Sequence, residues 1–115
     1  MSTDTRYNGW TNYETWLVNL WMDNEQGSQQ FWHDAARECW AESGPKHPNP
    51  FVADHEGNAR ILLADRLKDE HEEARPETTG VFADLIGAAL AEVNWYEIAQ
   101  ALLDTVKEET ADHAD

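Results

Sequence analysis

Apolar side chains recur at three- and four-residue spacing in the first part of this chain. The stretch begins at a capping box, residues 11–14, in which Thr11 and Glu14 can each accept a free amide proton. The apolar positions that follow are Tyr13, Trp16, Leu17, Leu20 and Trp21. This spacing places them on one face of an α-helix, so the pattern predicts a helix from Thr11 that stops between Asn24 and Gly27.

Two further helices are predicted between Ser28 and Pro76. The second runs from a Ser28 cap to near Gly44, and its apolar stripe is Phe31, Trp32, Ala35, Ala36, Cys39 and Trp40. The third opens at an Asn49-Pro50 cap, with proline at the first helical position, and is bounded by Pro76. Its predicted inward residues are Val52, Ala59, Leu62, Leu63 and Leu67.

The last third of the chain predicts two more helices. The fourth begins at a Thr79 cap, and its predicted inward residues are Val81, Phe82, Leu85, Ile86, Ala89 and Leu90. The fifth begins at Asn94, a polar cap followed three residues later by Glu97. Its stripe is Trp95, Ile98, Ala99, Leu102, Leu103 and Val106.

Length and composition fit one compact domain. The chain has 115 residues, of which 41% are apolar, including six Trp. Domains usually need about 100–150 residues, so this length allows one. Alternating β-branched runs, which would indicate strands, are missing. The sequence therefore predicts an all-α fold: a compact single-domain bundle of about five helices over residues 1–115, with residues 1–9 and 110–115 frayed.

Charge restricts the function more than hydrophobicity does. There are 23 Asp and Glu residues against eight Lys and Arg residues, which gives a formal net charge of −15. Nucleic acids and anionic membrane surfaces would repel such a chain. No apolar run approaches the roughly 18 residues that a membrane span needs, and residues 1–9 lack a signal-peptide core. We therefore expect a cytoplasmic protein that binds neither nucleic acid nor membrane directly.

Acidic residues form a row on the fifth predicted helix. Asp104, Glu108 and Asp112 recur every four residues, Glu97 is nearly in register, and Glu109 lies beside the row. Carboxylates at this spacing are about 6 Å apart and can imitate the phosphates of a nucleic-acid strand. The hypothesis is that these five residues bind a basic protein that handles DNA or RNA. A saline habitat, or the need for solubility, would explain the same acidity without any partner.

Aromatic residues are concentrated near the N-terminus. Residues 8–16 read Asn-Gly-Trp-Thr-Asn-Tyr-Glu-Thr-Trp, and each has an ordinary structural role in a tight entry, a cap or a core. The alternative is that Trp10, Asn12 and Tyr13 form a partner-binding surface, because rigid aromatics concentrate binding energy. In that case the protein is an interaction module that also self-associates, as a homodimer.

The two aromatic runs resemble the two ends of a known family. Residues 8–16 and the later run Val93–Ala99, which reads Val-Asn-Trp-Tyr-Glu-Ile-Ala, are similar to a family of small proteins without established activity. Its members are carried by bacteriophages, plasmids and related mobile genomes. The resemblance implies an accessory protein of such an element, which inhibits a defence enzyme if the acidic row acts as a mimic.

The sequence offers little catalytic chemistry. His33-Asp34 lacks the further ligands that a metal-dependent hydrolase needs, and Cys39 lies on an apolar stripe where a thiol is usually inert. Glu70 and Glu73 have the spacing of a magnesium-binding half-site, but no second acidic pair completes it. A magnesium-dependent nucleotide hydrolase is therefore a remote alternative. We predict no catalytic residue, no metal site and no cofactor.

Overall fold

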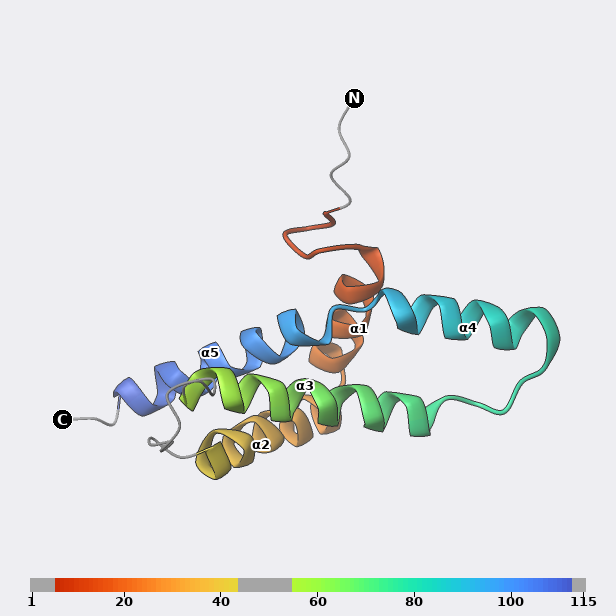
Figure 1. Ribbon diagram of the computed structural model, residues 1–115. Coiled ribbons are helices and arrows are strands. Elements are labelled where there is room, and N and C mark those ends of the chain that lie inside the picture. Colours follow the sequence, from red (N-terminus) through yellow and green to blue (C-terminus); the bar gives the residue numbers. More distant parts are fainter. Residues whose placement is uncertain (1–5, 44–54, 113–115) are drawn as a thin grey trace.

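The computed structural model describes residues 6–43 and 55–112, with side chains up to residue 109. In these residues the chain forms five helices and no strand, apart from an isolated bridge between Tyr7 and Trp10 (Figure 1). The helices are α1 (Tyr13–Asn24), α2 (Gln26–Ser43), α3 (His55–Ala74), α4 (Gly80–Glu92) and α5 (Trp95–Asp112). The predicted all-α fold with five helices is confirmed.

Helices α2, α3 and α5 pack against one another and enclose most of the core. Helix α1 runs steeply across them, and α4 projects from the bundle at the top of α1 (Figure 1). The core alternates small residues with large ones, which lets the helices approach closely. Its most buried members are Ala36, Ala59, Leu63, Leu67, Ile98, Ala99 and Leu103. None of the described helices is long and apolar enough to cross a membrane.

The break between the first two helices is a single residue. Glu25 is extended, with φ −96° and ψ 118°, and α2 begins at Gln26. The prediction of a break up to a Ser28 cap was therefore wrong: Gly27 and Ser28 lie within α2. The Gln29 N–H donates to the Glu25 carbonyl at 2.8 Å, so the backbone hydrogen bonds of the second helix already begin at Glu25.

The ends of the later helices follow the predictions where they are described. Helix α3 ends at Ala74, before Pro76, and Thr79 occupies the N-cap position of α4, although its side chain makes no capping hydrogen bond. The predicted Asn49-Pro50 cap and Val52 lie outside the described residues.

Some predicted inward residues are exposed instead. On α3 the buried stripe is Ala59, Leu63, Ala64 and Leu67, while Leu62 is 41% exposed. Adjacent helical residues lie about 100° apart around the axis. The core covers the side of Leu63 that carries Ala64, so Leu62, on the other side, is left exposed. The other exposed members of the predicted stripes are Tyr13, Trp21, Phe31, Val81, Phe82, Leu85 and Ala89.

Candidate protein-binding site at the cap junction

A two-residue turn fixes the entry to α1. Tyr7 and Trp10 exchange two backbone hydrogen bonds of 2.8 Å across Asn8 and Gly9. Both turn residues have positive φ, 48° at Asn8 and 89° at Gly9, which is the conformation of a type I′ turn. Asn-Gly is the residue pair that this turn favours, so the signal was present in the sequence, although the prediction took Gly9 as a tight entry only.

The cap of α1 is Asn12, one residue after the predicted Thr11. The Asn12 Oδ1 atom accepts the Thr15 N–H at 2.9 Å and the Thr15 hydroxyl at 2.6 Å. The Asn12 Nδ2 group donates to the Glu92 carbonyl at 2.7 Å, at the end of α4. Asn12 therefore uses its whole amide in fixing α1 to the α4–α5 connection.

The start of α1 and the start of α5 are hydrogen-bonded to each other around their cap residues, Asn12 and Asn94. Thr15, which is fully buried, accepts the Asn94 N–H at 2.9 Å, and Asn94 Nδ2 donates to the Thr11 hydroxyl at 3.2 Å. The Thr11 N–H in turn donates to Glu97 Oε1 at 2.8 Å. Asn94 also caps α5 by accepting the Glu97 N–H at 3.1 Å. We call this set of contacts between residues 11–15 and 92–97 the cap junction.

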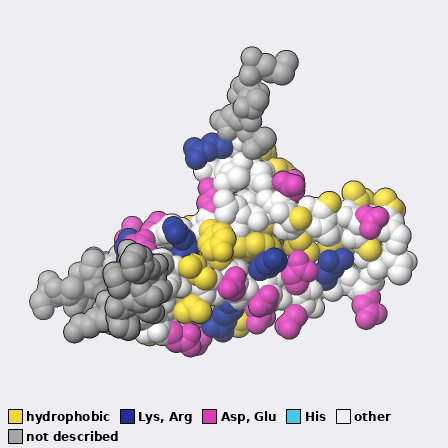
Figure 2. Space-filling view, in the orientation of Figure 1, with side chains coloured by type: hydrophobic (Ala, Val, Ile, Leu, Met, Phe, Trp, Pro, Cys, Tyr) yellow, Lys and Arg dark blue, Asp and Glu magenta, His cyan; other side chains and the backbone are white. Residues whose placement is uncertain are grey.

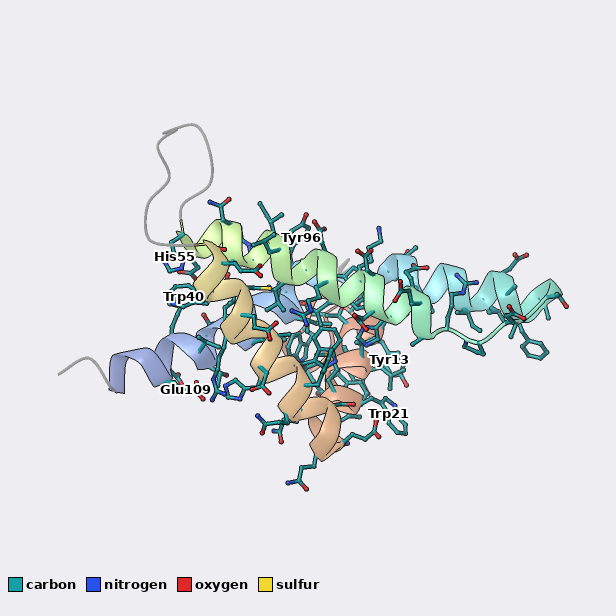
Figure 3. The ribbon with its side chains drawn as sticks, turned by 90° about the horizontal axis from the view of Figure 1, so that it is seen from below. Tyr13, Trp21, Trp40, His55, Tyr96 and Glu109 are labelled. Carbon is teal, nitrogen blue, oxygen red and sulfur yellow. The ribbon has the colours of Figure 1, made fainter. Side chains whose placement is uncertain are left out.

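Aromatic rings cover the outer side of the cap junction. Tyr7, Tyr13 and Trp16 form a triangle with ring centroids 4.7–5.6 Å apart. Tyr13 is 47% exposed and lies on the outer side of α1, as does Trp21 (Figure 3). Trp10 is half-buried and packs against the core. Of the three predicted aromatic-run candidates, Tyr13 is therefore the most accessible, whereas Asn12 has a structural role.

Two hollows flank the cap junction. One, of about 280 Å³, is lined by Gly9, Trp10, Glu97, Gln100, Ala101 and Asp104. The other, of about 350 Å³, is lined by Asn12, Tyr13, Glu14 and Glu92. Together they present four carboxylates and two aromatic rings, and neither lining includes a lysine or an arginine. Five of the eight predicted candidates line these hollows, although they come from opposite ends of the chain.

Gln100 is held in place in the first hollow. It donates to Glu56 Oε2 at 2.7 Å and to Asp104 Oδ1 at 3.0 Å, and it accepts from Arg60 at 3.3 Å. Asp104 therefore stands at the rim of the hollow with its carboxylate oriented by a neighbouring side chain.

The rest of the predicted acidic row is less uniform than the sequence suggests. Glu109 accepts two hydrogen bonds of 3.1 Å from Arg37 of α2, and its Oε1 atom lies 2.8 Å from His33 Nε2 (Figure 3). Glu108 is exposed, and the side chain of Asp112 lies outside the described residues. On the same helix Lys107 pairs with Glu56 at 2.9 Å. Arg37 and His33 of α2 thus engage Glu109, which sequence spacing within α5 could not reveal.

The model of one protein family covers almost the whole chain. It matches residues 3–114, and its description is a family of unknown function, DUF7249. This chain belongs to DUF7249. Comparisons with curated proteins and with solved structures gave no match. Membership in DUF7249 carries no activity with it, so the function of this protein has to be argued from its geometry.

The structure places several of the residues that the sequence analysis considered for catalysis or metal binding in this DUF7249 protein. No three His, Cys, Asp or Glu side chains lie close enough there to hold a metal ion. Cys39 is buried, and burial raises the pKa of its thiol, which disfavours the nucleophilic thiolate. Asp34 is bonded to Gln30 and Arg37, while His33 faces Glu109 instead of forming a pair with Asp34.

The Arg37–Glu109 pair makes a testable contribution to acid stability. Hydrogen bonding to Arg37 lowers the pKa of Glu109 from its ordinary value of 4.5, so the unfolded chain takes up the proton first as the pH falls. The pair stabilises the fold above that ordinary pKa and is lost as the pH falls through the lowered value. We expect Glu109→Gln to lose less stability than the wild type between about pH 5 and pH 3.

Urea unfolding midpoints measured at successive pH values test this expectation. Glu108→Gln is the matched control, because it removes the same charge from the adjacent, exposed position of α5. Relief of general repulsion in acid affects both variants alike. If the stability of the two variants depends on pH identically, the contacts of Glu109 with Arg37 and His33 contribute nothing to acid stability.

Proposed function

We propose that this DUF7249 protein is a non-catalytic accessory protein that binds a basic protein partner at the cap junction. The observation that carries the proposal is the lining of the two hollows, with four carboxylates, two aromatic rings and no lysine or arginine. A lysine or arginine side chain gains from both groups, since its charge pairs with carboxylates and its cationic head is attracted to aromatic faces.

Two further properties support binding at this place. One side chain in each hollow, Glu97 and Asn12, is held by a hydrogen bond of the cap junction, and Asp104 accepts from Gln100, so a partner would not have to order these three side chains first. The net charge of −15 accelerates the approach of a positively charged partner and makes the affinity fall as salt is added.

The more specific form of the proposal is mimicry of a nucleic acid. Asp104 and Glu108 are exposed on α5 and continue the acidic rim of the first hollow along the helix. A DNA- or RNA-handling protein has a basic groove that such a surface could occupy. The resemblance of the two aromatic runs to proteins of phages and mobile elements supports a defence enzyme as the target. Glu97 and Glu109 contribute less to such a surface, because Glu97 already accepts the Thr11 N–H and Glu109 already pairs with Arg37.

Titration with a short oligo-arginine peptide, followed by NMR of the backbone amides, tests the proposed site. We expect the shifts to concentrate at Gly9, Trp10, Gln100 and Asp104, and Asp104→Lys to weaken binding about tenfold. Glu70→Lys, at an exposed position of α3, is the matched control because it changes the net charge equally. Added salt should weaken binding to the wild type.

The two variants separate a site from a general charge effect. If Glu70→Lys weakens binding as much as Asp104→Lys, the peptide senses only the net charge and the proposed site is wrong. Tyr13→Ala should also weaken binding without affecting the fold, because the ring is 47% exposed. Shifts spread evenly over all acidic helices would contradict the proposal in the same way.

A further inference from the structure

Helix α4 is apolar on two faces, and only one of them is covered. Its inner stripe, which is half-buried, consists of Ala83, Ile86, Gly87 and Leu90. Its outer stripe consists of Val81, Phe82, Leu85, Ala88 and Ala89, all exposed, with Val81, Phe82 and Leu85 at 63%, 67% and 59%. None of the thirteen residues of α4 is fully buried.

A helix that is apolar all round is normally buried all round. In this structure α4 packs chiefly on α1 and otherwise projects from the bundle (Figure 1). Hydrophobic side chains gather over α4, whereas acidic and basic side chains alternate over the neighbouring α3 (Figure 2). Between Gly80 and Ala91 the one charged residue is Asp84. The outer stripe is thus an uncharged patch on a strongly acidic chain.

We propose that the outer stripe of α4 binds the same stripe of a second copy, forming a two-fold symmetric homodimer. Electrostatics favours this occupant. Two chains of charge −15 repel each other over most of their surfaces, and the repulsion is smallest where each presents an almost uncharged face. A basic partner, in contrast, would find one carboxylate at this place and many elsewhere.

The size of the stripe fits a weak dimer. The exposed parts of its five side chains amount to roughly 450 Å² per copy, or about 900 Å² for two, slightly under the roughly 1,000 Å² of a stable interface. We therefore expect a dissociation constant in the micromolar range, so that dimers form as the concentration rises.

The distribution of large and small residues favours an antiparallel arrangement. In the outer stripe Val81, Phe82 and Leu85 occupy the first half of α4, and the two small residues Ala88 and Ala89 occupy the second half. A two-fold axis across the middle of α4 would place the large side chains of each copy over the small residues of the other.

Sedimentation equilibrium over a concentration series tests the dimer. We expect Phe82→Glu and Leu85→Glu each to raise the dissociation constant at least about tenfold, because each would bring two carboxylates to the two-fold interface. Ile61→Glu is the matched control, as Ile61 is an apolar residue of α3 with 41% exposure. Circular dichroism confirms that each variant keeps its helices.

Salt distinguishes this proposal from the proposed binding of a basic partner. Screening reduces the repulsion between two copies, so the dimer should become tighter with salt, whereas peptide binding at the cap junction should become weaker. Asp104→Lys and Tyr13→Ala, outside α4, should leave the Phe82-dependent association in place. The experiments can therefore contradict the α4 dimer or the binding of a basic partner at the cap junction without contradicting the other.

Cross-linking gives an independent measurement. Ala88→Cys should be joined to a second copy by a short bis-maleimide, whereas the wild-type Cys39, 3% exposed, should not react. The proposal is wrong if the protein stays monomeric into the hundreds of micromolar, or if it dimerises equally well with Glu at position 82. Absence of the Ala88→Cys cross-link in a sample that sediments as a dimer would also contradict it.

Discussion

Leu63→Ala should lower the free energy of unfolding by about 2–5 kcal/mol. Leu63 is fully buried between α3 and its neighbours, so the shortened side chain would leave a cavity that surrounding helices could close only in part. Urea or thermal unfolding, followed by circular dichroism, measures the difference.

Leu62→Ala is the control for that experiment. Leu62 has the same chemistry and the same helix, but it is 41% exposed, so its truncation should cost about 1 kcal/mol or less. The sequence alone predicted both leucines to face inward. Equal losses for the two variants would mean that α3 presents a different face to the core.

Thr15→Val should destabilise the protein by about 1–3 kcal/mol, although valine fills the same volume. The Thr15 hydroxyl accepts the Asn94 N–H and donates to Asn12 Oδ1 in a site from which water is excluded. Valine leaves the part-buried Asn94 amide without its acceptor, and it loosens the cap of α1 at the same time. Chemical denaturation measures the loss, and amide exchange at Asn94 should accelerate.

Thr15→Ser separates the hydroxyl from the methyl group. Serine keeps the hydroxyl with its two hydrogen bonds and loses only one methyl group. We therefore expect Thr15→Ser to lower the free energy of unfolding by about 1 kcal/mol, through lost packing alone. The hydrogen-bonding role is refuted if Thr15→Val is as stable as the wild type, or if Thr15→Ser is the more damaging change.

The helices could be predicted well because the periodicity of apolar residues is a property of each segment by itself. Periodicity within α2, α3 and α5 identified Ala36, Ala59, Leu67 and Leu103 as inward residues, and all are buried. The start of α1 was one residue off, because a four-residue motif cannot reveal that Thr11 finds its partner in Glu97, 86 positions away. A cap completed by another part of the chain has no local sequence signal.

The candidate site could be predicted only in part for the same reason. Spacing along α5 suggested one continuous acidic row, yet Glu109 is paired with Arg37, 72 positions away. Conversely, Trp10 and Asp104 line one hollow, although nothing in the sequence relates them. On α4, periodicity identified the apolar residues but could not decide which of two apolar faces packs on α1.

The cap junction also sets an order on folding. Its long-range hydrogen bonds join residues that are 79–86 positions apart in the sequence, so they close a loop that contains most of the described chain. Contacts of that separation carry a large loop-closure entropy and form late. During synthesis, α2 and α3 can pair while Thr15 still waits for Asn94. Of the five described helices, α1 comes first in the sequence, yet its cap junction is completed only once Asn94 and Glu97 at the start of α5 are available.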